Sequence, residues 1–203
     1  MRKTFLLWII GVFAVVAVVF FGPLAVVSTP ADPATKASAT KDQKIARGAY
    51  LVNFGSCNDC HSPKVMTDQG PVPDKSRLLS GHPAVSKLPP FKKEDIGPGK
   101  WVLFSEDLTA CVGPWGVTCA ANLTPDENTG IGLWTEEMFM NAIRTGKHMG
   151  AGRPIMPPMP WFSVAELTDD DLSAVFAYLR SLPPVKNPVP APMTLDDYAA
   201  MKK

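Results

Sequence analysis

The run Cys57-Asn58-Asp59-Cys60-His61 constrains this chain more than any other part of its sequence. Cys-x-x-Cys-His is the attachment pattern of c-type haem. Two thiols three residues apart can each add to one vinyl group of the same porphyrin, and the imidazole that follows can then bind the iron. We therefore predict one covalent haem c, attached through Cys57 and Cys60, with His61 as the first axial ligand of the iron.

Two other kinds of site use a Cys-x-x-Cys pair. A redox dithiol is expected between a strand and a helix in a βαβ pattern, which this sequence lacks. A zinc site needs a second pair of ligands at comparable spacing, whereas the remaining cysteines, Cys111 and Cys119, enclose seven residues. Both alternatives stay open, and both fit the sequence less well than haem.

The N-terminal segment is strongly apolar. Residues 5–27 carry no charge, and Arg2 and Lys3 are the only charged residues before Asp32. A membrane span needs about 20 apolar residues, while the apolar part of a cleaved signal peptide has about 7 to 15. We expect residues 1–27 to form an uncleaved N-terminal transmembrane helix, with a cleaved signal peptide as the alternative.

This segment also predicts a location. Positive charges before a membrane span favour a cytoplasmic N-terminus. We therefore expect a single-pass protein of the inner (cytoplasmic) membrane, with the haem domain on the periplasmic or outer side.

The rest of the chain divides by composition and length. Residues 28–41 are rich in Ala, Thr, Pro and Ser and predict a flexible tether. Residues 42–186 predict one haem-binding domain, and residues 187–203 a C-terminal tail. The whole chain has 20 Lys and Arg against 19 Asp and Glu, and this balance argues against a nucleic-acid partner.

Helical periodicity begins at Asp42. Apolar and small residues recur there with helical spacing, and Gly48 lies in the middle of the predicted helix. A glycine at this position weakens a helix, so we expect it to allow close approach by the last helix of the domain.

Two further helices have clear start and stop signals. Thr135 can cap a helix that ends near Arg144, and Gly146 can close it. Thr168 can cap the last helix, which Pro183-Pro184 ends. No segment alternates as a strand does, so the predicted fold class is all-α.

These residues resemble the class I c-type cytochrome domains, especially those in the cytochrome c subunits of membrane-bound alcohol and gluconate dehydrogenases. The resemblance extends from Arg47 to Leu182 and implies a cytochrome c-like helical domain around one covalent haem. The matching segments are Arg47-Gly48-Ala49-Tyr50-Leu51, the Cys57 to His61 run, Asn122-Leu123-Thr124-Pro125-Asp126, Thr129-Gly130-Ile131-Gly132-Leu133-Trp134, and Met159-Pro160-Trp161 followed by Leu167 to Leu179.

The resemblance also implies the second iron ligand. In this family the axial methionine opens a Met-Pro-aromatic motif before the last helix, and Met159 matches that motif. Met156 is the weaker alternative because Pro157-Pro158 follows it. His148 as the ligand, or an open iron site, remains a further alternative.

Other contacts of the haem follow from the same resemblance. Gly70-Pro71 is similar to the Gly-Pro whose carbonyl accepts a hydrogen bond from the proximal histidine in cytochromes c, so Pro71 is a candidate partner of His61; a plain turn is the alternative. Asn122, Trp134 and Arg77 are candidates for the haem propionates, with ordinary structural roles as the alternative.

The two remaining cysteines predict a disulfide. Cys111 and Cys119 flank a segment that contains Gly and Pro and can turn back on itself. In an oxidising compartment, two spare cysteines this close are expected to bond.

The predicted function is electron transfer by a single haem c with His/Met ligation. The chain would act as a membrane-tethered carrier or as a subunit of an electron-transfer complex, with respiratory complexes or a dehydrogenase as redox partners. The alternatives are the redox-accepting subunit of a periplasmic dehydrogenase, and a haem enzyme or gas sensor with an open iron site. We expect a carrier or electron-transfer subunit rather than an enzyme, because only His82 and His148 remain as distal acid–base candidates and neither lies in a distal-pocket motif.

Overall fold

The structure, a computed structural model, describes residues 39–201. The helices within this range are α1 (Lys41–Phe54), α2 (Cys57–His61), α3 (Glu136–Thr145), α4 (Trp161–Val164), α5 (Asp169–Ser181) and α6 (Leu195–Met201). The strands are β1 (Lys64–Thr67), β2 (Gly70–Pro73), β3 (Leu103–Phe104), β4 (Ala110–Gly113) and β5 (Gly116–Cys119). Short 3-10 turns lie at Lys75–Arg77, Lys93–Asp95 and His148–Gly150.

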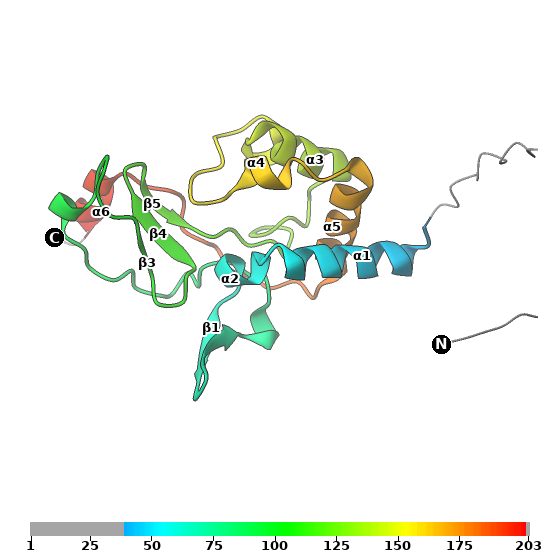
Figure 1. Cartoon of the computed structure of the whole chain (residues 1–203), viewed down its shortest axis with the longest axis horizontal. Coiled ribbons are helices and arrows are strands. Elements are labelled where there is room, and N and C mark those ends of the chain that lie inside the picture. The colour runs from blue at the N-terminus through cyan, green and yellow to red at the C-terminus, as the bar shows by residue number, and fades with distance from the viewer. Residues whose placement is uncertain (1–38, 202–203) are drawn as a thin grey trace, which may run out of the picture. The chain divides into compact units, whose positions relative to one another are not determined.

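Helix α1 crosses α5 at close range, as Figure 1 shows. A capping box starts α1: the Thr40 hydroxyl accepts from the backbone N–H of Gln43, and the Gln43 side chain accepts from that of Thr40. At the crossing, a Cβ added to Gly48 would lie 2.0 Å from the carbonyl oxygen of Ala174. The predicted role of Gly48 at a helix contact is confirmed.

The predicted ends of α3 and α5 are also confirmed. Thr135 caps α3 by accepting from the backbone N–H of Met138, and Gly146 ends it with a φ of 65°. Thr168 caps α5 by accepting from the backbone N–H of Asp171. Short polar side chains and a glycine define these ends because they satisfy backbone groups that the helix leaves free.

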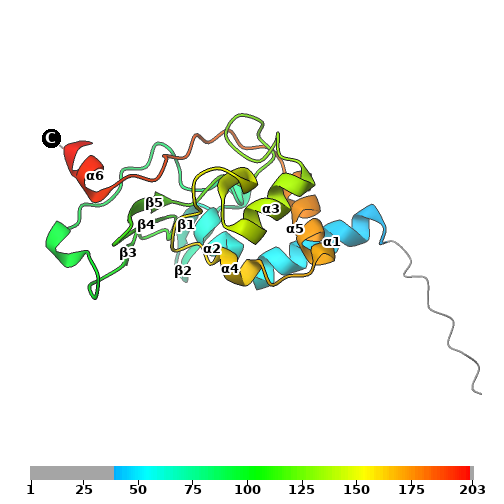
Figure 2. The ribbon, with the colours of Figure 1, turned by 90° about the horizontal axis from the view of Figure 1, so that it is seen from above.

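Helices α1, α3 and α5 enclose the larger hydrophobic core. Figures 1 and 2 show these helices, with α4, together in one part of the described chain. The buried residues of this core are Val52, Leu79, Ile131, Phe139, Ile143, Leu172, Val175, Phe176 and Leu179.

The all-α prediction is wrong, because two small antiparallel sheets accompany the helices. Strands β1 and β2 form one hairpin, and β3, β4 and β5 form a sheet in that order. Each strand has only two to four residues, and β2 reads Gly70-Pro71-Val72-Pro73. Strands this short and this rich in proline show no detectable alternation, which is why the sequence pattern did not predict them.

A second, smaller core lies between the three-stranded sheet and the C-terminal segment. Met193 pairs with Val117 of β5, and Tyr198 of α6 donates to the carbonyls of Leu88 and Pro89 at 3.2 Å each. Figure 1 shows α6 beside this sheet, on the side of residues 39–201 away from α5. The buried residues of the second core are Ile96, Val112, Val117 and Tyr198.

The transmembrane helix expected at residues 1–27 lies outside the described residues. Within residues 39–201, no helix has both the length and the apolar character needed to cross a bilayer. The expected localisation, a single-pass protein of the inner membrane, is corrected accordingly, because this part of the chain offers no spanning helix to support it.

Candidate functional site

The Cys57 to His61 run forms its own short helix, α2, directly after α1. Ser56 joins the two helices in a left-handed conformation, with a φ of 54°. Cys57 and Cys60 are both free thiols and half-buried, and their spacing places them on the same side of α2. Burial raises the pKa of each thiol, so both carry their protons at neutral pH.

The ring of His61 is held through one of its nitrogens. Its Nδ1 lies 2.8 Å from the carbonyl oxygen of Ala121. A carbonyl can only accept, so Nδ1 carries the hydrogen and Nε2 keeps a lone pair. Burial lowers the pKa of His61, which favours this neutral form although the Ala121 carbonyl opposes the shift. Within residues 39–201 no hydrogen bond reaches Nε2, so this nitrogen can bind a metal.

The support of His61 comes from a segment that the sequence analysis did not single out. Ala121 directly precedes the Asn122 motif, and that adjacency was the only signal in the sequence. Gly81 strengthens the contact by donating its backbone N–H to the His61 carbonyl at 2.7 Å. Pro71 lies elsewhere, on the exposed strand β2 opposite Met66.

Lys64 is a second residue that the sequence analysis missed. Its ammonium donates to the carbonyls of Asn58, Asp59 and Ser62 at 3.0, 2.8 and 2.6 Å. These carbonyls lie at the C-terminal end of α2, where a positive charge is favourable. Lys64 therefore closes the helix that carries both thiols and the imidazole.

The methionine-rich loop between α3 and α4 contacts the β4–β5 hairpin. Met156 and Met159 are both half-buried, and Thr118 of β5 donates to the carbonyl of Pro157 between them at 2.9 Å. At the end of the loop, Trp161 packs on Gly146: a Cβ added there would lie 2.5 Å from the indole ring. The loop is thus held at its base and at its middle, with Met159 two residues before the start of α4.

The remaining candidates have structural partners. Asn122 accepts from the backbone N–H of Thr124 and donates to the carbonyl of Val185. Arg77 pairs with Asp74 at 2.9 Å. Trp134 meets the ring of His148 edge-on, with the ring centroids 5.1 Å apart, and His148 itself is exposed.

The predicted disulfide does not form, because Cys111 and Cys119 are both free. The register of the hairpin gives the reason: Cys111 faces Thr118, and Cys119 faces Ala110. Successive residues of a strand point to opposite faces, so the two sulfur atoms lie on opposite sides of the sheet. Burial raises the pKa of each thiol to about 11.

Two alternative chemistries find no support in the described part of the chain. Within residues 39–201, no three His, Cys, Asp or Glu side chains gather closely enough to hold a metal ion, as a zinc site would require. The strand pairs described there are antiparallel hairpins, so the βαβ context of a redox dithiol is not seen in residues 39–201.

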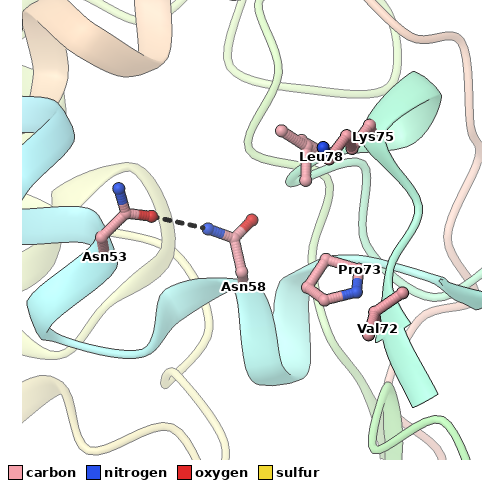
Figure 3. A pocket seen from close by; sticks show the side chains of 6 residues that line it. All are labelled: Asn53, Asn58, Val72, Pro73, Lys75 and Leu78. Carbon is pink, nitrogen blue, oxygen red and sulfur yellow. Dashed lines mark hydrogen bonds between the residues drawn. The ribbon is translucent and has the colours of Figure 1, made fainter. Parts of the chain in front are cut away.

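An open pocket of about 470 Å³ lies beside α2 but includes neither thiol, nor His61, nor Met159. Figure 3 shows Asn58 pointing into it from α2, hydrogen-bonded to Asn53 of α1. The chemistry of the donor atoms therefore locates the functional site better than this pocket does. The pocket is lined by Asn53, Asn58, Val72, Pro73, Lys75 and Leu78.

Comparison with known proteins bears on this donor set. The cytochrome c subunit of the quinone alcohol dehydrogenase of Gluconobacter oxydans is 38% identical over 145 residues, which cover 71% of this chain and 23% of the relative. The gluconate 2-dehydrogenase cytochrome c subunit of Pantoea cypripedii is 29% identical over 137 residues, 68% of this chain and 23% of the relative. The fructose dehydrogenase cytochrome subunit of Gluconobacter japonicus is 28% identical over 162 residues, 79% of this chain and 26% of the relative. The chain is a homologue of these cytochrome subunits.

This homology confirms the resemblance expected from the sequence. The chain spans about a quarter of the length of the relatives that it matches. No family model matches the chain.

Proposed function

We propose that this chain transfers electrons through one covalently attached haem c, held by Cys57, Cys60, His61 and Met159. Haem supplies one-electron redox chemistry at its iron. The observation that carries the proposal is the state of His61, whose Nδ1–H is donated to Ala121 while Nε2 keeps a free lone pair. A protein that ligates a metal through histidine arranges the ring in this way.

The two thiols are in the state that attachment requires. Cys57 and Cys60 are reduced and protonated, and both lie on one side of α2. Addition of a thiol to a vinyl group forms a carbon–sulfur bond at one vinyl carbon and a carbon–hydrogen bond at the other. The addition balances without an oxidant or a leaving group.

Met159 is the proposed second ligand. A thioether raises the reduction potential relative to a second imidazole and closes the iron to small molecules. The contacts of Thr118 with Pro157 and of Trp161 with Gly146 support this role, because they restrain the loop on both sides of Met159.

The proposed redox partner is a dehydrogenase. The relatives are cytochrome subunits of alcohol, gluconate and fructose dehydrogenases, so an enzyme that oxidises a small organic substrate is the electron donor that the homology favours. Redox proteins dock through small interfaces, below about 1,200 Å² in total, so that they can separate quickly. The exposed apolar side chains of Phe54 and Met66, which flank α2 in the sequence, suit such a contact.

The ligation is tested with Met159→Ala in the haem-loaded protein. We expect loss of the long-wavelength Fe–S absorption band and a lower midpoint potential, because the ferric iron loses a ligand that favours the reduced state. Met156→Ala is the matched control and should keep the band. An unchanged spectrum in Met159→Ala contradicts the assignment.

Binding of carbon monoxide distinguishes an electron carrier from a haem enzyme or gas sensor with an open iron site. A six-coordinate carrier should show no rapid spectral change when carbon monoxide is added to the reduced protein. Met159→Ala should bind the gas at once. Immediate binding by the unsubstituted protein contradicts the carrier function.

A further inference from the structure

His82 is a buried histidine with one nitrogen that nothing in the described chain satisfies. Its side chain is 2% exposed, and Nε2 has no hydrogen-bond partner within residues 39–201. An unpaired buried nitrogen is unfavourable, so a group outside this part of the protein is expected to meet it.

The partners of Nδ1 determine which protons the ring carries. Nδ1 lies 2.7 Å from the hydroxyl oxygen of Thr109, and that hydroxyl lies 2.8 Å from a carboxylate oxygen of Asp107. A carboxylate can only accept, so the Thr109 hydrogen is donated to Asp107, and Nδ1 must donate to Thr109. Nε2 is therefore a lone pair in the neutral ring and a donor only in the imidazolium.

The charges around His82 favour a second anion. Asp107 is the charged group that acts on His82, and the same carboxylate also acts on Lys64 and Cys119. Burial lowers the pKa of His82, and the attraction of Asp107 opposes this effect. An anion at Nε2 would act in the same direction as Asp107 and stabilise the imidazolium.

His82 lies in the segment that supports the proposed iron ligand. Its backbone N–H donates to the carbonyl of Ala120 at 2.9 Å, and Ala121 is the partner of His61. The neighbouring Gly81 donates to the carbonyl of His61 itself. The backbone at Gly81 and His82 is thus bonded both to His61 and to the segment that supports its imidazole.

A haem attached at α2 would supply two anions, its propionates. These propionates would leave the porphyrin on the edge opposite the vinyl groups that Cys57 and Cys60 would hold. A propionate takes charge-assisted hydrogen bonds from nitrogen donors. We propose that His82, as an imidazolium backed by Thr109 and Asp107, binds a haem propionate through Nε2. This inference rests on the proposed function, since it needs the haem.

The test is the midpoint potential of the haem-loaded full chain as a function of pH. In the unsubstituted protein the potential should fall as pH rises through the titration of His82, because loss of a nearby positive charge favours ferric iron. His82→Gln should have the lower potential throughout and lack this step. His82→Lys, which keeps the charge, should lack the step but keep the potential near the acid-side value of the unsubstituted protein.

If His82 had only a structural role, the midpoint potentials of the glutamine and lysine variants would not differ according to their charge. The Fe–S absorption band, measured in each, shows whether the axial ligands are intact. A step that persists in both variants, or equal potentials in the glutamine and lysine variants, overturns the assignment.

A second measurement needs no variant. Nitrogen NMR of the reduced, diamagnetic protein should show both His82 nitrogens protonated at neutral pH, and a bare Nε2 there overturns the proposal. The pyridine haemochrome spectrum shows whether haem is attached, and so distinguishes failure of the proposed function from failure of the His82 assignment. A chain that takes up no haem overturns the proposed function together with this assignment, whereas a haem-loaded chain that fails the tests above overturns the assignment alone.

Discussion

Burial is the largest cause of the raised pKa at each of the four thiols of this chain. Haem attachment consumes Cys57 and Cys60 in the proposed function, which leaves Cys111 and Cys119 as the thiols that can titrate. Both have a pKa of about 11 in the folded chain, above the ordinary value of 9.0 for a free thiol. Between these two values the folded state binds more protons than the unfolded state.

The free energy of unfolding should therefore be fully retained below pH 9 and fall as pH rises toward 11. The loss should be about 1 kcal/mol per thiol between pH 8 and pH 10. Urea unfolding of the haem-loaded protein at the two pH values measures it. A Cys111→Ala and Cys119→Ala double variant is the control, since other groups also titrate there. An equal loss in the control contradicts the prediction.

At the scale of elements, the crossing of α1 and α5 depends on Gly48. Helix propensity alone favours Gly48→Ala by about 1 kcal/mol. The contact opposes this, because the new Cβ would lie 2.0 Å from the Ala174 carbonyl oxygen and the two helices would have to separate. Arg47 adds a bidentate ion pair with Asp171 across the same contact, at 2.8 and 3.2 Å.

We expect Gly48→Ala to destabilise the domain by about 2 kcal/mol, since overpacking exceeds the gain in propensity. Denaturant unfolding measures the change. Ala46→Gly, on the exposed side of α1, is the control and should cost about 1 kcal/mol through propensity alone. A more stable Gly48→Ala variant would show that the helices do not cross at this residue.

Helix α2 depends on Lys64, which binds three carbonyls at its C-terminal end. Lys64→Met keeps the length of the side chain but leaves these carbonyls without the ammonium. We expect a loss of about 1 to 3 kcal/mol in the free energy of unfolding of the haem-loaded protein. The exposed Lys75 offers a control, and Lys75→Met should change stability little. Equal effects of the two substitutions contradict the role of Lys64.

At the scale of the described chain, the two cores are built from different parts of the sequence. The helical core joins α1 to α5, while the second core joins the three-stranded sheet to the C-terminal segment. Asn187 links them: its side chain donates to the carbonyls of Ser80 and His82 and accepts from the backbone N–H of Ala84. The C-terminal segment therefore holds the loop that carries His82.

Tyr198→Ala should loosen the second core while the helical core stays folded. The ring stacks on Phe91, with the centroids 5.0 Å apart, and its hydroxyl donates to two backbone carbonyls. We expect a loss of about 3 to 5 kcal/mol, and faster proteolysis between residues 87 and 119 than in the helices. Tyr198→Phe keeps the stack and should cost only about 1 kcal/mol. Uniform proteolysis across both cores would contradict this separation.

The sequence alone determined the features that depend on neighbouring residues. The caps at Thr135 and Thr168 were predicted because local hydrogen bonding decides them. A helix contact at Gly48 was predicted because a glycine in the middle of a helix weakens that helix unless close packing requires it.

Only the tertiary structure decided the contacts between distant segments. It replaced the predicted disulfide with two thiols on opposite faces of a hairpin, and it showed that Ala121, rather than a residue near His61, supports the imidazole. It also joined His82 to Thr109 and Asp107. The physical reason is that strand register and long-range hydrogen bonds depend on how the chain packs, and no local pattern of residues records that packing.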